Sequence, residues 1–293
     1  FNMALCGATC VLVPGHIVWM PRFLVQFVRQ ARITCWYSVP SILAGMLQDG
    51  RLAEHEYPGL RVILFAGEVF AGPSVARLQA AVPQAICANL YGPTETNVVT
   101  WYRVPRDFSG SQPLPIGQPC PYATVMLDSS TGELLVAGNS LMSGYWNRPE
   151  DTQHAFVTEQ GTRYYRTGDR VSRAPDGNLL FLGRLDRQIK RRGFRIELGE
   201  IEAALLRQKD ILEAAAVAAE VNVDGGQMGT CITAFVRARS AGAVTLVEAK
   251  AHCARTLPPY MVPDRIVFLN AIPKGSRGKI DYMALAKIAK EPE

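Results

Sequence analysis

The chain has 293 residues, of which 48% are hydrophobic and 19% charged, and its formal net charge is +5. This composition fits a soluble globular protein with one large domain or two ordinary ones, and it argues against disorder. The cations are spread along the sequence except in KRRGFR at 190–195. Neither the dense basic face nor the reading motif expected of a nucleic-acid-binding protein is therefore visible.

The seven cysteines are scattered, without a CxxC pair and without neighbouring histidines. This pattern favours reduced thiols over a disulfide framework or a zinc site. No apolar run reaches the roughly 18 residues that a membrane-spanning helix needs, and no signal peptide is recognisable. We therefore expect a cytoplasmic protein that has neither nucleic acid nor a membrane as a partner.

The first part of the chain, residues 1–110, alternates short apolar runs with helix-like stretches. Strands are predicted at 10–15, 34–41, 61–68 and 85–92, and helices at 23–33 and 74–82. Such alternation is typical of a layered, largely parallel sheet. Because the chain starts with Phe1 rather than Met, inside an apolar segment, we expect a partial α/β core and a chain that is a fragment of a longer protein.

Residues 111–185 have a different character. Prolines cluster between 104 and 122 and indicate a connection, because proline cannot donate to a sheet ladder. Two apolar runs flank a polar turn in ATVMLDSSTGELLVAG at 123–138, and APDGNLLFLGR at 174–184 repeats the pattern. We expect a small β-barrel-like subdomain here.

Residues 186–293 are predicted to form an α+β domain. Leu198, Ile201 and Leu205 recur at the spacing of one helix face. Thr245 and Glu248 have the spacing of a capping box, so a second helix should begin there. Apolar runs at 214–221, 231–238 and 265–270 predict strands.

The densest motif is NLYGPTETN at 89–97. Gly92 and Pro93 force a turn directly after a predicted strand. Tyr91, Thr94 and Glu95 then lie at the carboxyl end of the strand, where open α/β sheets bind ligands. An aromatic ring, a hydroxyl and a carboxylate could bind a base, a phosphate oxygen and Mg²⁺, although an ordinary Gly-Pro turn would look the same.

Three further residues have both a functional and an ordinary interpretation. Asp169 in RYYRTGDRV is placed at a glycine turn, where it could accept hydrogen bonds from two ribose hydroxyls or simply be solvated. Asp186 precedes the basic stretch and suits either a hinge or a plain linker. Lys279, near the end of the chain, could be a catalytic group or one more surface cation.

Taken in order, the motifs resemble the adenylation domains of nonribosomal peptide synthetases, within the adenylate-forming, AMP-binding enzymes. The resemblance rests on NLYGPTE, GELLVAGNSLMSGYWNRPE, YRTGD, GRLDRQIKRRGFRIELGEIE, LPPYMVP and GKID. It spans essentially the whole chain. It implies ATP- and Mg²⁺-dependent activation of an amino acid as its adenylate, then transfer to the phosphopantetheine thiol of a carrier protein. An acyl- or aryl-CoA ligase and a non-catalytic remnant that binds nucleotide or a carrier protein remain alternatives.

The resemblance also implies a role for each motif residue. Around ATP, Tyr91 would stack on adenine beside Gly92, Thr94 would meet the α-phosphate, Glu95 would hold Mg²⁺, Asp169 would bind the ribose, Phe181 would lie beside the sugar, and Arg184 would lie near the ribose and phosphate. In the mobile C-terminal domain, Asp186 matches the hinge, Lys190 the basic residue of the thioester-forming state, and Lys279 the catalytic lysine.

The family's substrate pocket maps onto Tyr37, Leu64, Ala66, Leu90, Val98 and Val99, together with Lys279. This lining is apolar with one phenol, so we expect a small or medium uncharged amino acid. The set is similar to that of free-standing domains that activate L-proline. The family's glycine-rich phosphate loop, and the aspartate that pairs with the substrate's amino group, are expected upstream of Phe1, so the chain alone should adenylate inefficiently.

Overall fold

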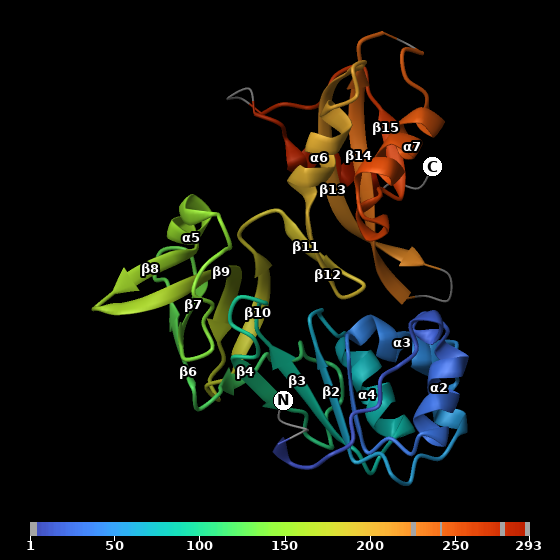
Figure 1. Cartoon of the computed structure of the whole chain (residues 1–293), viewed down its shortest axis with the longest axis vertical. Helices are drawn as coiled ribbons and strands as arrows, with labels where there is room; N and C mark the ends of the chain where they lie inside the picture. Colours follow the sequence, from blue (N-terminus) through green and yellow to red (C-terminus); the bar gives the residue numbers. More distant parts are fainter. Residues whose placement is uncertain (1–4, 224–226, 241, 276–278, 291–293) are drawn as a thin grey trace. The chain divides into compact units, whose positions relative to one another are not determined.

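The computed structural model describes residues 5–223, 227–240, 242–275 and 279–290. The chain divides into two compact units, Phe1–Leu185 and Asp186–Glu293 (Figure 1). Each unit is described by itself below. None of the helices in these described ranges is long and apolar enough to cross a membrane.

A five-stranded sheet forms the first part of the first unit. Its strands are β1 (Cys35–Ser38), β2 (Val62–Ala66), β3 (Ile86–Tyr91), β4 (Thr100–Arg103) and β5 (Gln118–Pro119), in the order β1-β2-β3-β4-β5. The first three strands are parallel, as predicted, and β4 and β5 are antiparallel to their neighbours. Because β5 belongs to this sheet, the sheet continues beyond residue 110.

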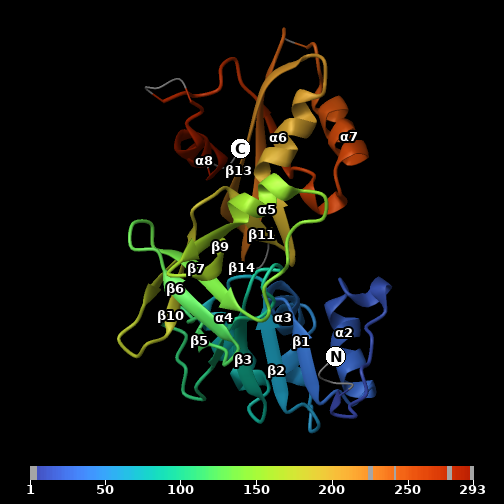
Figure 2. The ribbon, with the colours of Figure 1, turned by 60° about the vertical axis from the view of Figure 1, so that its left-hand side comes forward.

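Helices cover one face of this sheet (Figure 1 and Figure 2). They are α2 (Pro21–Gln30), α3 (Pro40–Gln48) and α4 (Gly72–Ala81), with short 3₁₀ turns η1 (Gly15–Ile17) and η2 (Leu52–Glu54). Trp36, Ile63 and Phe65 pack against the buried faces of the helices in one apolar core. The predicted helices at 23–33 and 74–82 are confirmed as α2 and α4, whereas α3 was not predicted.

The buried strand predicted at 10–15 is wrong. Residues 8–14 have no regular secondary structure, and the Leu12 side chain is 83% exposed. A strand needs a partner to bond its backbone groups. β1 is the end strand of its sheet, and no strand of the described residues pairs with its other edge. Val13 and Ile17 instead pack beside the helical core.

A second sheet completes the first unit. Its strands are β6 (Ala123–Leu127), β7 (Glu133–Gly138), β8 (Phe156–Glu159), β9 (Thr162–Arg173) and β10 (Leu179–Arg184), and α5 (Pro149–Ala155) precedes β8. The order is β10-β9-β7-β6, with β8 also paired to β9. Both predicted hairpins are confirmed. The sheet is open rather than closed into a barrel, because β6 and β10 do not pair within residues 123–184, all of which are described.

A small apolar core joins the two sheets of the first unit. It contains Tyr91 from the first sheet, Val99 from the turn just before β4, and Leu134, Val171 and Leu179 from the second sheet. A backbone bond from Ile116 N–H to the Leu179 carbonyl, 2.8 Å long, ties the segment just before β5 to β10. The carboxyl end of β3 therefore lies directly against the second sheet.

The second unit is a three-stranded sheet with helices on both faces, as the predicted α+β domain requires. It contains β11 (Gln188–Arg191), β12 (Phe194–Glu197), α6 (Leu198–Leu206), β13 (Ile211–Val223), β14 (Gln227–Ala238), α7 (Leu246–Thr256), η3 (Pro259–Met261), β15 (Arg265–Phe268) and α8 (Tyr282–Lys290). α6 and α7 pack with Ala234 and Val236, whereas α8 packs with Phe235 on the opposite face. The capping box of Thr245 and Glu248 is confirmed. The β11–β12 hairpin and α8 were not predicted.

Candidate functional site

The turn after β3 is the tightest approach of backbone to backbone in the predicted nucleotide motif. A Cβ atom on Gly92 would lie 1.7 Å from the Asn97 carbonyl oxygen, so this position has room only for glycine. The Val99 N–H donates to the Tyr91 carbonyl over 2.7 Å and closes the turn. The two ends of the turn pass so close together that Gly92 cannot be replaced without moving the backbone. The chain then continues directly into β4.

Thr94 and Glu95 lie on this turn, as predicted, but in different surroundings. Thr94 is exposed and Glu95 is half-buried. The Glu95 carbonyl accepts a hydrogen bond from Met142 N–H over 2.8 Å, and Glu95 Oε1 accepts one from the Tyr145 hydroxyl over 2.6 Å. The sequence motifs did not indicate these two contacts.

Asp169 lies inside β9 rather than at a turn, so that part of the prediction is wrong. Its neighbour Gly168 has a φ of +69°, which makes an irregularity within the strand instead of ending it. The Asp169 side chain is only 1% exposed. Its Oδ1 accepts from Arg184 Nη1 over 2.7 Å, and its Oδ2 accepts from the Tyr91 hydroxyl over 2.5 Å.

These contacts join three strands at one charged group. Tyr91 ends β3, Asp169 lies in β9, and Arg184 ends β10. A register shift between Phe181 and Gly183 brings Arg184 opposite Asp169. The structure thus brings together Tyr91, Asp169 and Arg184, with the half-buried Phe181 on the same strand as Arg184.

Electrostatics keep the Tyr91 phenol protonated. Burial raises the pKa of Tyr91 well above its usual value of 10, and the negative charge of Asp169 raises it further. Tyr91 is therefore a neutral donor, and the Arg184 guanidinium balances the Asp169 charge. Tyr91 is only about 5% exposed. In this structure Tyr91, Asp169 and Arg184 therefore bond one another instead of water.

Four of the predicted pocket residues share one face of the first sheet. Tyr37 pairs in register with Leu64, and Ala66 pairs with Leu90. Since side chains alternate along a strand, these four lie opposite the helix-covered face that holds Ile63 and Phe65. Tyr37 is 60% exposed. Val98 follows in the turn and is half-buried, whereas Val99 is fully buried in the core between the sheets.

The predicted residues of the second unit lie on its hairpin and its C-terminal loop. Lys190 lies in β11 opposite Arg195. Arg191 bonds Asp264 over 2.5 Å, and the Phe194 ring stacks on Tyr260, so the hairpin is fastened to the unit. Lys279 is exposed, and its carbonyl accepts from Gly275 N–H over 2.8 Å. Gly278 of the GKID motif is outside the described residues.

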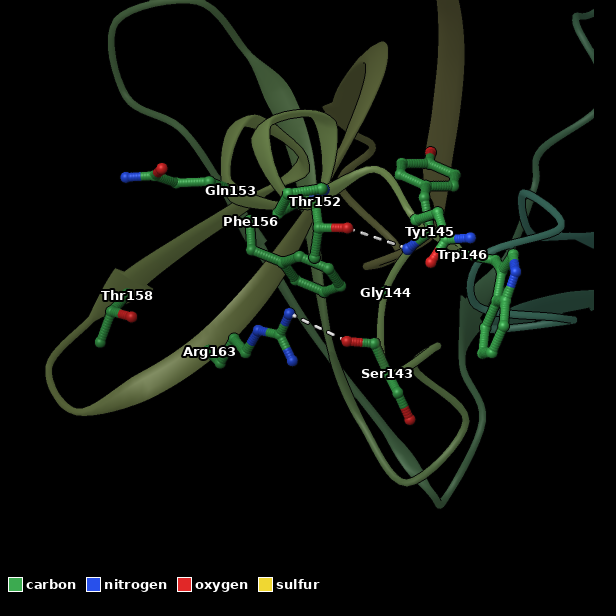
Figure 3. Close-up of a pocket in the computed structure, with 11 residues that line it drawn as sticks. Ser143, Gly144, Tyr145, Trp146, Thr152, Gln153, Phe156, Thr158 and Arg163 are labelled. Atoms are coloured by element: carbon green, nitrogen blue, oxygen red, sulfur yellow. Dashed lines mark hydrogen bonds between the residues drawn. The ribbon is translucent and has the colours of Figure 1, made fainter.

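An open pocket of about 780 Å³ lies beside α5 and β8 (Figure 3). The Arg163 guanidinium lies 3.5 Å from the centre of the Phe156 ring, and Thr152 Oγ1 accepts a hydrogen bond from Tyr145 N–H over 2.9 Å. Trp146 is 89% exposed at its rim. None of the predicted site residues lines this pocket.

Comparison with known proteins identifies the family. The model of the AMP-binding enzymes matches residues 1–146, and the model of the AMP-binding enzyme C-terminal domain matches residues 200–279. The chain belongs to the AMP-binding enzyme family. The matched ranges include the β3 turn with Glu95 and, in the second unit, Lys279, and they fall on both units of the fold.

Individual members of the AMP-binding family match over nearly the whole chain. L-Proline–(L-prolyl-carrier protein) ligases of Pseudomonas fluorescens and Streptomyces coelicolor are each 41% identical, over 96% and 97% of this chain and 55% and 54% of their own lengths. The Vibrio cholerae adenylation domain AlmE, solved with glycyl-adenosine-5'-phosphate, is 30% identical with a TM-score of 0.79, covering 94% of this chain and 53% of AlmE. The chain thus spans about half the length of the curated relatives it matches.

The acidic side chains of the described residues fit a metal ion that arrives with a ligand better than one held by protein groups alone. Within residues 5–223, 227–240, 242–275 and 279–290, no three His, Cys, Asp or Glu side chains come together as a metal site. Mg²⁺ is usually held by one or two carboxylates together with substrate phosphates, not by a cage of protein ligands. The half-buried Glu95 suits that arrangement.

Proposed function

We propose that this chain is part of an enzyme that activates an amino-acid carboxylate with ATP and then passes the aminoacyl group to the phosphopantetheine thiol of a carrier protein. The junction of Tyr91, Asp169 and Arg184 beside the Glu95 turn, in a member of the AMP-binding family, carries the proposal. A buried carboxylate held by a phenol and an arginine, next to a more accessible carboxylate, suits a nucleotide and its metal ion.

In the first half-reaction, a carboxylate oxygen of the amino acid attacks the α-phosphorus of ATP. A new P–O bond forms, and the bond to pyrophosphate breaks, so negative charge gathers on the phosphorus oxygens. We assign the exposed Lys279 ammonium to the carboxylate and an α-phosphate oxygen, where it offsets this charge and aligns the reactants. Thr94 would donate to the α-phosphate. Mg²⁺ held by Glu95 would neutralise further phosphate charge.

Nucleotide binding requires the bonded cluster to open. In the proposed complex, the ribose hydroxyls donate to Asp169 in place of the Tyr91 hydroxyl, which now occupies Oδ2. The released Tyr91 ring can then stack on adenine, with Phe181 beside the sugar and Arg184 near the ribose and phosphate. Gly92 keeps the turn free of a side chain that would displace the backbone.

In the second half-reaction, the carrier thiol gives up its proton and its sulfur attacks the acyl carbon. A thioester forms, the bond from the acyl carbon to the phosphate oxygen breaks, and AMP leaves with the bonding electron pair. We propose that the second unit turns about Asp186 and exchanges Lys279 for Lys190. Leu185 N–H bonds the Gly168 carbonyl within the first unit, and Arg187 bonds Glu202 within the second. Asp186 therefore lies between two anchored residues, where a hinge can absorb the change in backbone dihedrals.

The proposed substrate is L-proline or another small uncharged amino acid. The sheet face with Tyr37, Leu64, Ala66 and Leu90 is apolar apart from one phenol, and the two relatives with 41% identity are named for L-proline. A carrier protein is the proposed partner because the same names include one. We place the reaction in the cytoplasm, where the seven free cysteines would stay reduced.

Exchange of labelled pyrophosphate into ATP tests this function. The assay uses this chain completed by the remaining part of the Pseudomonas fluorescens relative, with each of the twenty amino acids in turn. We expect L-proline to drive the fastest exchange. Exchange driven only by fatty or aryl acids would favour a CoA ligase instead, and nucleotide binding without exchange would favour a non-catalytic remnant.

A further inference from the structure

The segment 142–145 holds Glu95 at two points. Met142 N–H donates to the Glu95 carbonyl over 2.8 Å, and the Tyr145 hydroxyl donates to Glu95 Oε1 over 2.6 Å. The first bond fixes the backbone of Glu95, and the second fixes the direction of its side chain. A residue held at both ends has little freedom to change rotamer.

Tyr145 is in turn fixed by α5. The Tyr145 N–H donates to Thr152 Oγ1 over 2.9 Å (Figure 3). The Thr152 hydroxyl donates in turn to the Arg148 carbonyl over 2.8 Å. A Cβ atom on Gly144 would lie 2.7 Å from Thr152 Cγ2, so the backbone passes close against the helix. The support thus runs from α5 through Thr152 and Tyr145 to Glu95.

The hydrogen bond between Tyr145 and Glu95 has a fixed polarity. The Tyr145 hydroxyl donates and the Glu95 carboxylate accepts, and such a charge-assisted bond is stronger than a neutral one. The phenol uses one of the roughly four acceptor positions of a carboxylate.

We propose that Tyr145 is a positioning residue that aims the Glu95 carboxylate at the Mg²⁺ ion of a bound nucleotide. This inference rests on the proposed function, and it adds a residue that the sequence motifs did not single out. Groups that hold a metal-binding carboxylate in place typically change metal affinity or activity 10- to 100-fold when they are removed. Tyr145→Phe removes the hydroxyl and keeps the ring.

Metal binding without turnover tests the inference first. Mn²⁺ serves as the probe, and its binding is measured by electron paramagnetic resonance. The protein is this chain completed by the remaining part of the Pseudomonas fluorescens relative, and the ligand is an α,β-methylene analogue of ATP, whose α–β linkage cannot be cleaved. Tyr145→Phe should weaken Mn²⁺ binding by about 10-fold or more. The matched control is Tyr102→Phe, which removes a hydroxyl that makes no hydrogen bond to any described residue; it should leave Mn²⁺ binding unchanged.

The kinetics of exchange provide the second readout. In Tyr145→Phe, the Mg²⁺ concentration for half-maximal exchange should rise by a similar factor, with much of the rate recovered at saturating Mg²⁺. In the background of Glu95→Gln, the same substitution should add little, because both changes act on one carboxylate. A merely structural role would lower the rate at every Mg²⁺ concentration.

The inference would be overturned by Mn²⁺ binding that is unchanged or tighter in Tyr145→Phe, or by a wild-type protein without nucleotide-dependent Mn²⁺ binding. Weaker binding in the variant supports it even where no amino acid drives exchange. In that case the proposed reaction fails while the role of Tyr145 stands, so the two failures are distinguishable.

Discussion

Asp169 is a buried charge whose stability depends on two neighbours. Both of its carboxylate oxygens are bonded, one to Arg184 and one to the Tyr91 hydroxyl, and its side chain is almost inaccessible to water. Removing water from a carboxylate is costly unless a partner compensates the charge. Arg184 is that partner, so we expect it to contribute to the stability of the folded chain as well as to nucleotide binding.

Replacing Arg184 by alanine should destabilise the chain by about 3–5 kcal/mol, because the Asp169 charge is left buried and uncompensated. The matched control is Arg148→Ala, which removes an ion pair with Asp151 that is mostly exposed and should cost less than about 1 kcal/mol. Urea unfolding of both variants makes the measurement. Equal effects of the two substitutions would contradict the structural role of Arg184.

The loop that carries Lys279 is held at its base by a charged cluster. Lys274 Nζ lies 2.5 Å from Glu213 Oε1, Arg237 also bonds Glu213, and Lys274 forms a bridge with Ile280. The hydrogen bond from Lys274 lowers the pKa of Glu213 below its ordinary value of 4.5, and Arg237 adds to the effect. The bridge between Lys274 and Ile280 joins the two sides of the loop, and Glu213 ties Lys274 to β13.

This cluster should give the second unit a pH-dependent stability. Because the folded pKa of Glu213 is lowered, its contribution is fully present above pH 4.5 and is lost as the pH falls through the lowered value. Urea unfolding at pH 7 should show Glu213→Gln to be less stable than wild type, with the difference shrinking below pH 4.5. The control Glu159→Gln alters an exposed carboxylate and should show no such trend. A difference for Glu213→Gln that is constant with pH would contradict the assignment.

Elements with a clear period could be predicted from the sequence, whereas elements without one could not. Leu198, Ile201 and Leu205 form the buried face of α6 as their spacing indicates. In α3, PSILAGMLQ is apolar at most positions, so no period separates a helix from a strand. The β11–β12 hairpin is rich in charge, which hides the strand alternation that an apolar face would show.

The sequence predicted which residues belong to the candidate site, but it did not predict the hydrogen bonds between them. The turn residues Thr94 and Glu95 were visible as a local motif. The partners of the charged groups were not, because Tyr91 and Asp169 are 78 residues apart and Glu95 and Tyr145 are 50 apart. Contacts of that range depend on which strands pair, and local spacing says nothing about this.

At the scale of the whole molecule, the proposed mechanism assigns one lysine of the second unit to each half-reaction. Lys190 lies on the hairpin that Arg191 and Phe194 fasten to that unit, and Lys279 lies on the loop that Lys274 holds. The two lysines are thus supported by separate contacts. A substitution at one should leave the other in place, which makes the two half-reactions separable.

The rate of L-proline-dependent pyrophosphate exchange in Lys279→Ala, compared with Lys190→Ala, tests the central claim most directly. Loss of a charge-stabilising contact at the transition state typically costs on the order of 10² to 10³ in rate. We therefore expect exchange to fall by about that factor in Lys279→Ala and to be nearly unchanged in Lys190→Ala. Exchange that persists at the wild-type rate without Lys279 would show that this lysine is only a surface cation, and it would contradict the proposed mechanism.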